Sequence, residues 1–253
     1  LHQMNRIFLS SAAAAFLIVA VGALIPGGQW GPTLLIVALV LDFVKRDDAH
    51  GTWHESHFRW RIHSVLWAML AYLLTLPLWL LILPGWQNSG PLHWQSRWEA
   101  LHGYTRVEQH DWLAPKRGDW IARLEEVVLS CTGPVALVAH SLGCLQVAAW
   151  AAHSKHVGRV EAAFLAAPGD SERSQEIEHL RSWRPIVRSP LPFPSVLVSS
   201  QDDPFCRPER AEQLALDWGS EHWDLGSKGH INADSGLGDW PEGHRRFTDF
   251  LKA

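Results

Sequence analysis

The chain has 253 residues, enough for one or two domains, and hydrophobic residues make up 47% of it, as is ordinary for a globular protein. Its formal net charge of -4 gives no electrostatic basis for binding nucleic acid. The three cysteines, Cys131, Cys144 and Cys206, show no metal-ligand spacing, and their odd number argues against a disulfide framework.

Residues 1–78 are predicted to be a membrane-associated helical segment. No charged residue occurs in residues 7–41 or 62–96, whereas the sequence after Arg97 has the composition of a soluble domain. The candidates for two or three membrane helices are three apolar runs, at residues 8–25, 30–44 and 62–76. The third run is short for a span, and extending it to Leu83 would use a strand that the next domain needs.

The loop at residues 45–61 holds four of the five basic residues of this segment. The positive-inside rule places the loop and the end that carries Arg6 in the cytoplasm. If the third apolar run spans the membrane, the rest of the chain lies outside the cytoplasm; if it lies in the interface, the rest stays inside. Three histidines in the loop could suggest a metal, but a polar interfacial loop is favoured, because no second-shell or cysteine partner is evident. These histidines are His50, His54 and His57.

From Lys45 to Trp60 the loop reads K-R-x-x-x-x-G-T-W-x-x-S-H-F-R-W. In this it resembles small bacterial polytopic membrane proteins of unknown function, and the resemblance implies membrane embedding and no chemistry. The sequence begins at Leu1, which leaves open whether it is a fragment or starts at Met4.

Residues 79–253 are predicted to form an α/β domain with a parallel sheet covered by helices on both faces. Strand-like and helix-like segments alternate along this part at the spacing of such a sheet. The expected strands are residues 79–83, 106–109, 134–139, 160–167, 195–200 and 223–225. The expected helices are residues 91–102, 118–129, 145–153, 207–218 and 242–252, with a further polar, helix-like stretch at 171–184.

The sequence Ala139-His140-Ser141-Leu142-Gly143 lies between an apolar strand and a helix rich in small residues. A small-x-Ser-x-Gly turn in this setting is typical of the nucleophile elbow of an α/β-hydrolase, where strand and helix nearly touch. The alternative is an ordinary strand-to-helix loop with a serine N-cap. The elbow predicts Ser141 as a nucleophile.

A serine hydroxyl is a weak nucleophile that needs an adjacent base, itself oriented by an acid. In this fold the chain order is Ser, then Asp or Glu, then His. His230 follows the last expected strand in a Gly-His loop and is the predicted base. Asp202 and Asp203 both follow the strand at 195–200, and Asp170 is a more distant candidate for the acid.

The predicted oxyanion hole consists of the backbone N–H groups of Trp86 and Leu142, because the loop after the first strand contains glycines that let the backbone approach a substrate oxygen. Gln87, His140 and Asn232 are candidates for pocket residues, although the loop after Asn232 could equally be plain surface. His140 adjoins the serine but projects in another direction and is not the predicted base. The mechanism requires no metal or other cofactor.

Four motifs in this order resemble the small serine hydrolases related to retinoblastoma-binding protein nine: Leu83-Pro84-Gly85-Trp86, His140-Ser141-x-Gly143, Ser200-Gln201-Asp202-Asp203-Pro204-Phe205 and Gly229-His230. The resemblance covers about residues 79–253. It implies a compact, lidless α/β-hydrolase whose triad is Ser141, Asp203 and His230, with small activated esters or amides as proxy substrates. Such proteins are normally soluble, which favours a cytoplasmic catalytic domain; the membrane segment departs from this pattern.

The sequence thus predicts a serine hydrolase that cleaves a small ester or amide through an acyl-enzyme and is attached to a membrane by residues 1–78. The alternative from another class is a non-catalytic, hydrolase-fold binding module anchored to a membrane. A third hypothesis is that the first segment is a gene fusion without a joint function.

Overall fold

The computed structural model describes residues 60, 62–64, 66–67, 78–173 and 178–252. The chain divides into two units, Leu1–Thr75 and Leu76–Ala253, and the fold below belongs to the second. The predicted apolar runs at 8–25 and 30–44, most of the run at 62–76 and the loop at 45–59 lie outside the described residues, so the membrane segment stays a prediction. Within the described ranges no helix combines the length and the hydropathy of a membrane crossing.

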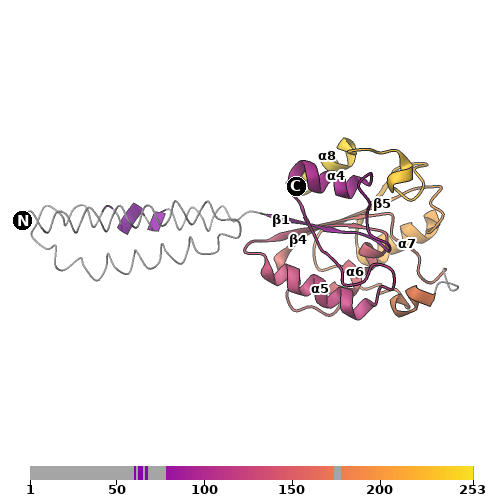
Figure 1. Ribbon diagram of the computed structural model, residues 1–253, viewed down its shortest axis with the longest axis horizontal. Helices are drawn as coiled ribbons and strands as arrows, with labels where there is room; N and C mark the ends of the chain where they lie inside the picture. Colours follow the sequence, from indigo (N-terminus) through magenta and orange to yellow (C-terminus); the bar gives the residue numbers. More distant parts are fainter. Residues whose placement is uncertain (1–59, 61, 65, 68–77, 174–177, 253) are drawn as a thin grey trace, which may run out of the picture. The chain divides into compact units, whose positions relative to one another are not determined.

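The described residues form a six-stranded, fully parallel sheet in the order β2-β1-β3-β4-β5-β6 (Figure 1). This confirms the predicted parallel α/β fold. The strands are β1 (Trp79–Leu83), β2 (Thr105–Arg106), β3 (Val135–His140), β4 (Val160–Ala166), β5 (Ser195–Ser199) and β6 (Glu221–Asp224). The strand expected at 106–109 is shorter than predicted and lies at the edge of the sheet, where one neighbour, β1, supplies its pairing.

Helices cover both faces of the sheet, as the sequence predicts. The helices are α4 (Trp94–His102), α5 (Arg117–Ser130), α6 (Leu142–Ala151), α7 (Pro208–Trp218) and α8 (Pro241–Phe250), with the 3-10 helices η2 (Val157–Arg159), η3 (Glu178–Trp183) and η4 (Ala233–Ser235). Buried side chains of α5, α6 and α7 belong to one hydrophobic cluster and those of α4 and α8 to the other. In Figure 1, α5 and α6 lie on one side of the sheet and α4 and α8 on the opposite side.

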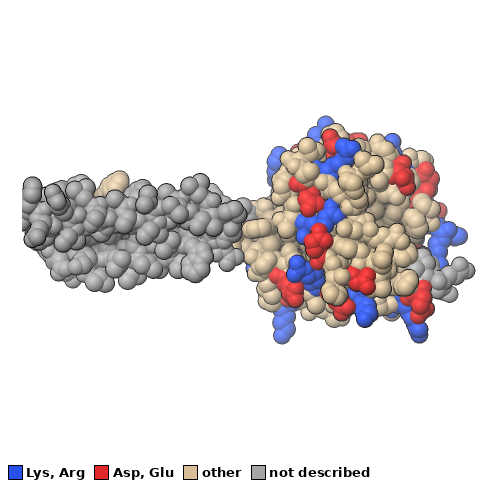
Figure 2. Space-filling view, in the orientation of Figure 1, with Lys and Arg blue, Asp and Glu red and all other residues tan. Residues whose placement is uncertain are grey.

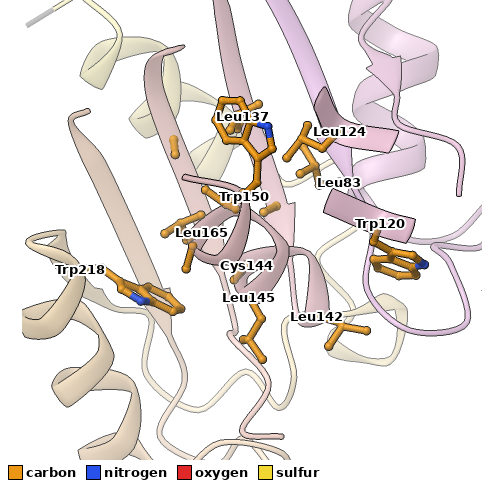
Figure 3. Packing of buried hydrophobic residues seen from close by; sticks show 14 of the residues in the cluster. Leu83, Trp120, Leu124, Leu137, Leu142, Cys144, Leu145, Trp150, Leu165 and Trp218 are labelled. Atoms are coloured by element: carbon orange, nitrogen blue, oxygen red, sulfur yellow. The ribbon is translucent and has the colours of Figure 1, made fainter. Parts of the chain in front are cut away.

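The strands supply both clusters because successive side chains of a strand point to opposite faces. Leu137 packs with Leu83 and Leu165 toward the helices α5 and α6, where Trp150 and Leu124 complete the contact (Figure 3). The neighbouring positions in β3 and β4, with Trp94, Trp98, Trp240 and Phe247, form the second cluster. Every strand residue of β3 is buried, as expected for a central parallel strand.

Three predicted helix starts differ from the observed ones. Helix α4 begins at Trp94 rather than at Pro91, since His93 is its N-cap and accepts the Gln95 N–H through its ring. Helix α6 already begins at Leu142, directly after the serine. Helix α5 begins at Arg117 rather than at Gly118, with Lys116 as its N-cap residue and no side-chain cap hydrogen bond.

Charged side chains of the described residues are mixed on the surface. On the face in Figure 2, basic and acidic groups alternate rather than gather by sign. Several are paired, such as Arg97 with Asp239 at 2.7 Å and Arg123 with Glu126 at 3.0 Å.

The strand order changes direction between β1 and β3, and this places the site. After β1 the chain turns outward to β2, then returns past β1 to β3. In open parallel sheets, ligands bind outside the carboxyl ends of the strands at such a switch point. Leu83, which ends β1, lies opposite Ala139 in β3, so the loops with Gly85 and Ser141 leave the sheet side by side.

Gly143 lies where helix α6 meets the end of β1. A Cβ atom at this position would lie 2.3 Å from the carbonyl oxygen of Leu83, a backbone atom that no side-chain rotation can move away. The glycine of the small-x-Ser-x-Gly pattern is therefore required by packing.

We expect Gly143→Ala to lower the free energy of unfolding by at least about 2 kcal/mol, because the added methyl group overpacks a backbone contact. Gly158→Ala is the matched control, since a Cβ there meets nothing within 4 Å. Urea unfolding of both variants measures the difference. Equal stabilities would contradict the close approach of α6 to β1.

Candidate active site

Ser141 lies in a strained turn between β3 and α6. Its backbone angles are φ 54° and ψ -118°, outside the regions that residues with a side chain normally adopt. The turn is held by the Ser141 N–H, which donates to the Ala166 carbonyl of β4 at 3.0 Å. Strain of this kind persists where the surrounding structure determines it, and it is concentrated at functional sites.

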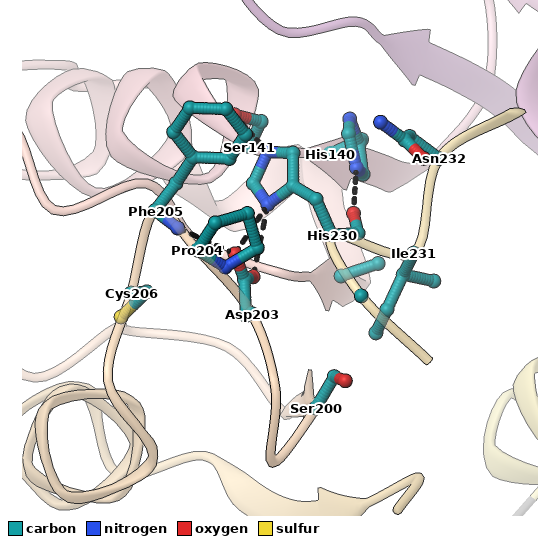
Figure 4. Close-up of polar contacts among 12 residues, drawn as sticks. His140, Ser141, Ser200, Asp203, Pro204, Phe205, Cys206, His230, Ile231 and Asn232 are labelled. Carbon is teal, nitrogen blue, oxygen red and sulfur yellow. Dashed lines mark hydrogen bonds and ion pairs between the residues drawn. The ribbon is translucent and has the colours of Figure 1, made fainter. Parts of the chain in front are cut away.

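A continuous chain of hydrogen bonds joins Ser141, His230 and Asp203 (Figure 4). The Nε2 atom of His230 lies 2.9 Å from Ser141 Oγ, and its Nδ1 atom lies 2.9 Å from each carboxylate oxygen of Asp203. A carboxylate only accepts, so Nδ1 carries the proton and Nε2 is free to accept from the serine hydroxyl. The structure thus brings together the three residues that the sequence places in the triad.

The structure also separates Asp203 from the two other candidates for the acid. Asp202 is turned away: its Oδ1 accepts the Ser200 hydroxyl at 2.8 Å and the Gly229 N–H at 2.7 Å. These bonds, the Ser200 hydroxyl first, lower the pKa of Asp202. Asp170 accepts hydrogen bonds from the backbone N–H groups of Glu172 and Arg173. Asp203, in contrast, lies within hydrogen-bond distance of the His230 ring.

The two predicted oxyanion donors border the serine. Leu142 is the first residue of α6, where a backbone N–H has no partner within the helix. Within the described part of the chain, no hydrogen-bond acceptor is recorded for the N–H of Leu142 or of Trp86. A Cβ on Gly85 would lie 2.7 Å from Ser141 Cβ, so the backbone before Trp86 passes directly beside the serine.

A cavity of about 490 Å³ lies over Ser141 and is lined by the loops at the carboxyl ends of the strands. The predicted pocket residues Gln87, His140 and Asn232 all line it, as do Trp86 and Leu142. Several other lining residues have no sequence pattern that indicates a pocket role; they include His93, Gly169, Ser171, Leu180 and Phe205. The positions of these residues depend on loop conformations and on where helices begin. The hydrophobic periodicity of the sequence predicts neither of these features.

The charges around the cavity are few. None of the described lining residues is Lys or Arg, and their one carboxylate belongs to Asp170. Asp170 forms an ion pair with Arg210 at 3.5 Å. Phe205 is about half exposed and packs edge-on against the His230 ring, with 4.6 Å between centroids. Asp170 apart, the described lining residues therefore include no Asp, Glu, Lys or Arg side chain.

Two buried, neutral histidines lie behind His230. The rings of His93 and His140 are 4.6 Å apart, and those of His140 and His230 are 4.9 Å apart. Burial lowers the pKa of His93 to about 3, with smaller effects from His230 and Arg106. Burial also holds the pKa of His140 well below its usual value. Neither ring adds a positive charge beside His230 at neutral pH.

The nearby thiols are not set up as nucleophiles. Cys144 and Cys206 are buried, and burial raises the pKa of both thiols, that of Cys206 to about 12. A thiol reacts as the thiolate, which these environments disfavour. Among the described residues, no group of three or more His, Cys, Asp or Glu side chains could hold a metal ion.

The burial of His93 predicts a pH dependence of stability. The unfolded chain binds a proton at this residue near pH 6.5, whereas the folded chain does so only near pH 3. Stability is therefore lost as the pH falls through this window, by about 2 kcal/mol at pH 5 from this group alone.

We expect His93→Asn, which keeps an oxygen acceptor for the Gln95 N–H, to reduce the loss of stability between pH 8 and pH 5 by about 2 kcal/mol. Urea unfolding at both pH values measures it. Parallel pH dependences for the wild type and the variant would contradict a neutral, buried His93.

Comparisons with known proteins identify the family of the chain. Residues 80–249, more than half of the chain, match the family described as serine hydrolase. A YdeN-like hydrolase of Pectobacterium atrosepticum SCRI1043 is 29% identical, with a TM-score of 0.63 over 73% of this chain and 96% of that chain. The ydeN gene product of B. subtilis is 17% identical, with a TM-score of 0.56 over 70% of this chain and 100% of that chain, and shows the fold alone.

Est1E of Butyrivibrio proteoclasticus, solved with ferulic acid, likewise shows the fold, with 10% identity and a TM-score of 0.54 over 70% of this chain and 90% of that chain. No curated protein matches the chain. The narrower resemblance to relatives of retinoblastoma-binding protein nine stays a prediction. The family match is sufficient for the broader conclusion: the chain belongs to the serine hydrolase family and is a serine hydrolase enzyme.

Proposed function

We propose that this enzyme hydrolyses small, uncharged esters or amides through an acyl-enzyme on Ser141, with His230 as the base and Asp203 as the acid that orients it. The observation that carries the proposal is the hydrogen-bond chain from Ser141 Oγ through both ring nitrogens of His230 to Asp203, with 2.9 Å at each step. These are the distances at which proton transfer to a base becomes possible.

The proposed reaction has two halves. His230 Nε2 takes the hydroxyl proton of Ser141 as Oγ attacks the substrate carbonyl carbon, and the N–H groups of Trp86 and Leu142 bind the resulting oxyanion. His230 then gives the proton to the leaving alcohol or amine, and the acyl group stays on Oγ. Water, deprotonated by His230, attacks the acyl carbon and releases the acid and the free serine. Asp203 stabilises the imidazolium form of His230 throughout.

The charge of the cavity supports an uncharged substrate. A carboxylate or phosphate near the scissile bond would find no Lys or Arg among the described lining residues. Trp86, Leu180 and Phe205 offer apolar walls, and the volume suits a small ligand. We therefore infer that neutral acyl esters are better substrates than anionic ones.

We expect Ser141→Ala to abolish turnover of a neutral p-nitrophenyl ester, because the attacking oxygen is removed while its neighbours stay in place. Ser189→Ala, at an exposed serine, is the control and is expected to keep wild-type turnover. Turnover of the folded Ser141→Ala variant at the wild-type rate would contradict the assignment. A folded wild type without any esterase or amidase activity would favour the binding-module alternative.

We expect Asp203→Asn to lower kcat by about 10⁴-fold, because an amide can donate to His230 Nδ1 and so favours the wrong tautomer. Asp202→Asn is the matched comparison one residue away, since this side chain accepts from the Gly229 backbone and the Ser200 hydroxyl. Its effect on kcat is expected to be much smaller. A larger loss in Asp202→Asn than in Asp203→Asn would assign the acid to Asp202.

The attachment to a membrane is a separate proposal that rests on the uncharged runs in residues 1–78. We expect the full chain to remain with the membrane fraction after an alkaline carbonate wash. Release of the full chain by the wash would overturn this proposal and leave the hydrolase assignment untouched.

A further inference from the structure

The loop that carries His230 contains a strained residue. Ile231, directly after His230, has φ 49° and is completely buried. The left-handed region is costly for a β-branched side chain, so such a conformation persists only where neighbouring contacts enforce it. The contacts that enforce it here therefore also fix the backbone of the base.

Side chains hold three consecutive residues of this loop, each by one backbone hydrogen bond. Asp202 Oδ1 accepts the Gly229 N–H at 2.7 Å. The indole N–H of Trp94 donates to the Ile231 carbonyl at 2.8 Å. Between these two, the Nε2 atom of His140 lies 2.8 Å from the carbonyl oxygen of His230 itself (Figure 4).

The bond from His140 joins the two halves of the catalytic machinery. His140 is the last residue of β3 and immediately precedes Ser141, whereas its acceptor is 90 positions away along the chain. The end of β3, which positions Ser141, thus also holds the backbone of His230. A small displacement of His230 would change the distance from its Nε2 atom to Ser141 Oγ, which is 2.9 Å.

The surroundings of His140 fix the tautomer that this bond requires. A carbonyl only accepts, so Nε2 of His140 carries the proton. The ring is 5% exposed, and the His93 ring packs against it in an edge-on arrangement. His93 is itself oriented, because its Nδ1 atom accepts the Gln95 N–H at 3.1 Å. His140 is therefore a rigid, neutral donor.

We propose that His140 is a positioning residue, whose Nε2–H bond to the His230 carbonyl holds the base in line with Ser141. The inference rests on the proposed function of Ser141 and His230. His140 also lines the cavity, but the role proposed here is exerted through its bond to His230. Without its donor, the buried carbonyl of His230 loses its partner and the strained loop relaxes. Misplacement of a catalytic group by about 1 Å can cost a factor of about 10² in rate.

Two amide variants of His140 distinguish the effect of the hydrogen-bond donor from the effect of side-chain volume. In His140→Gln the amide nitrogen takes the place of Nε2, whereas in His140→Asn it takes the place of Nδ1 and does not reach the carbonyl. We expect His140→Gln to keep kcat within about 3-fold of the wild type and His140→Asn to lose about 10-fold to 100-fold, each with KM changed less than about 3-fold.

Steady-state kinetics on the full chain, with circular dichroism to verify folding, gives the result. Equal kcat values for the folded Gln and Asn variants, or a change in KM alone, would overturn the inference. If His140→Asn does not fold, His140→Phe replaces it as the variant without a donor, with the same expected loss. A Ser141→Ala variant that remains active would overturn the proposed function. An inactive Ser141→Ala variant together with unaffected His140 variants would overturn the role of His140 alone.

Discussion

The contact between the first turn of α6 and the end of β1 is the constraint on which the site depends. A side chain at Gly143 would meet the Leu83 carbonyl, and one at Gly85 would meet Ser141. Because two backbone segments pass this closely, the turn at Ser141 adopts its unusual dihedral angles and its side chain is held beside the loop of Trp86. Backbone packing at Gly85 and Gly143 thus sets the geometry around Ser141, and the polar contacts of the site add to it.

The polar contacts of the site form a network around the buried carboxylate of Asp203. Asp203 is almost fully buried, and its charge faces His230. Buried polar groups stabilise a structure only when they are paired, and the loop of His230 is paired at three consecutive residues. The neutral state of His93 and His140 matters here, because a second positive charge beside His230 would oppose formation of its imidazolium during the reaction.

The sequence predicts those parts of the site that follow directly from strand order. Ser141, Asp203 and His230 each come after a strand, and the carboxyl ends of parallel strands meet at one edge of the sheet, so their approach could be expected. The choice between Asp202 and Asp203 depends on the turn after β5, which directs adjacent side chains apart. The places of His93 and His140 depend on a helix N-cap and on a partner 90 residues away, and neither leaves a pattern in the sequence. Most of the predicted membrane segment lies outside the described residues, and it remains a prediction.

The most direct test of a poised Ser141 is to locate the covalent adduct of a fluorophosphonate by peptide mass spectrometry of the full-length protein at neutral pH. We expect a single adduct per chain on the peptide that contains Ser141, and no adduct when the protein is unfolded in urea before labelling, since reactivity then lacks the His230 base. An adduct on another serine such as Ser171 or Ser200, or no adduct on the folded protein, would contradict the central role of Ser141.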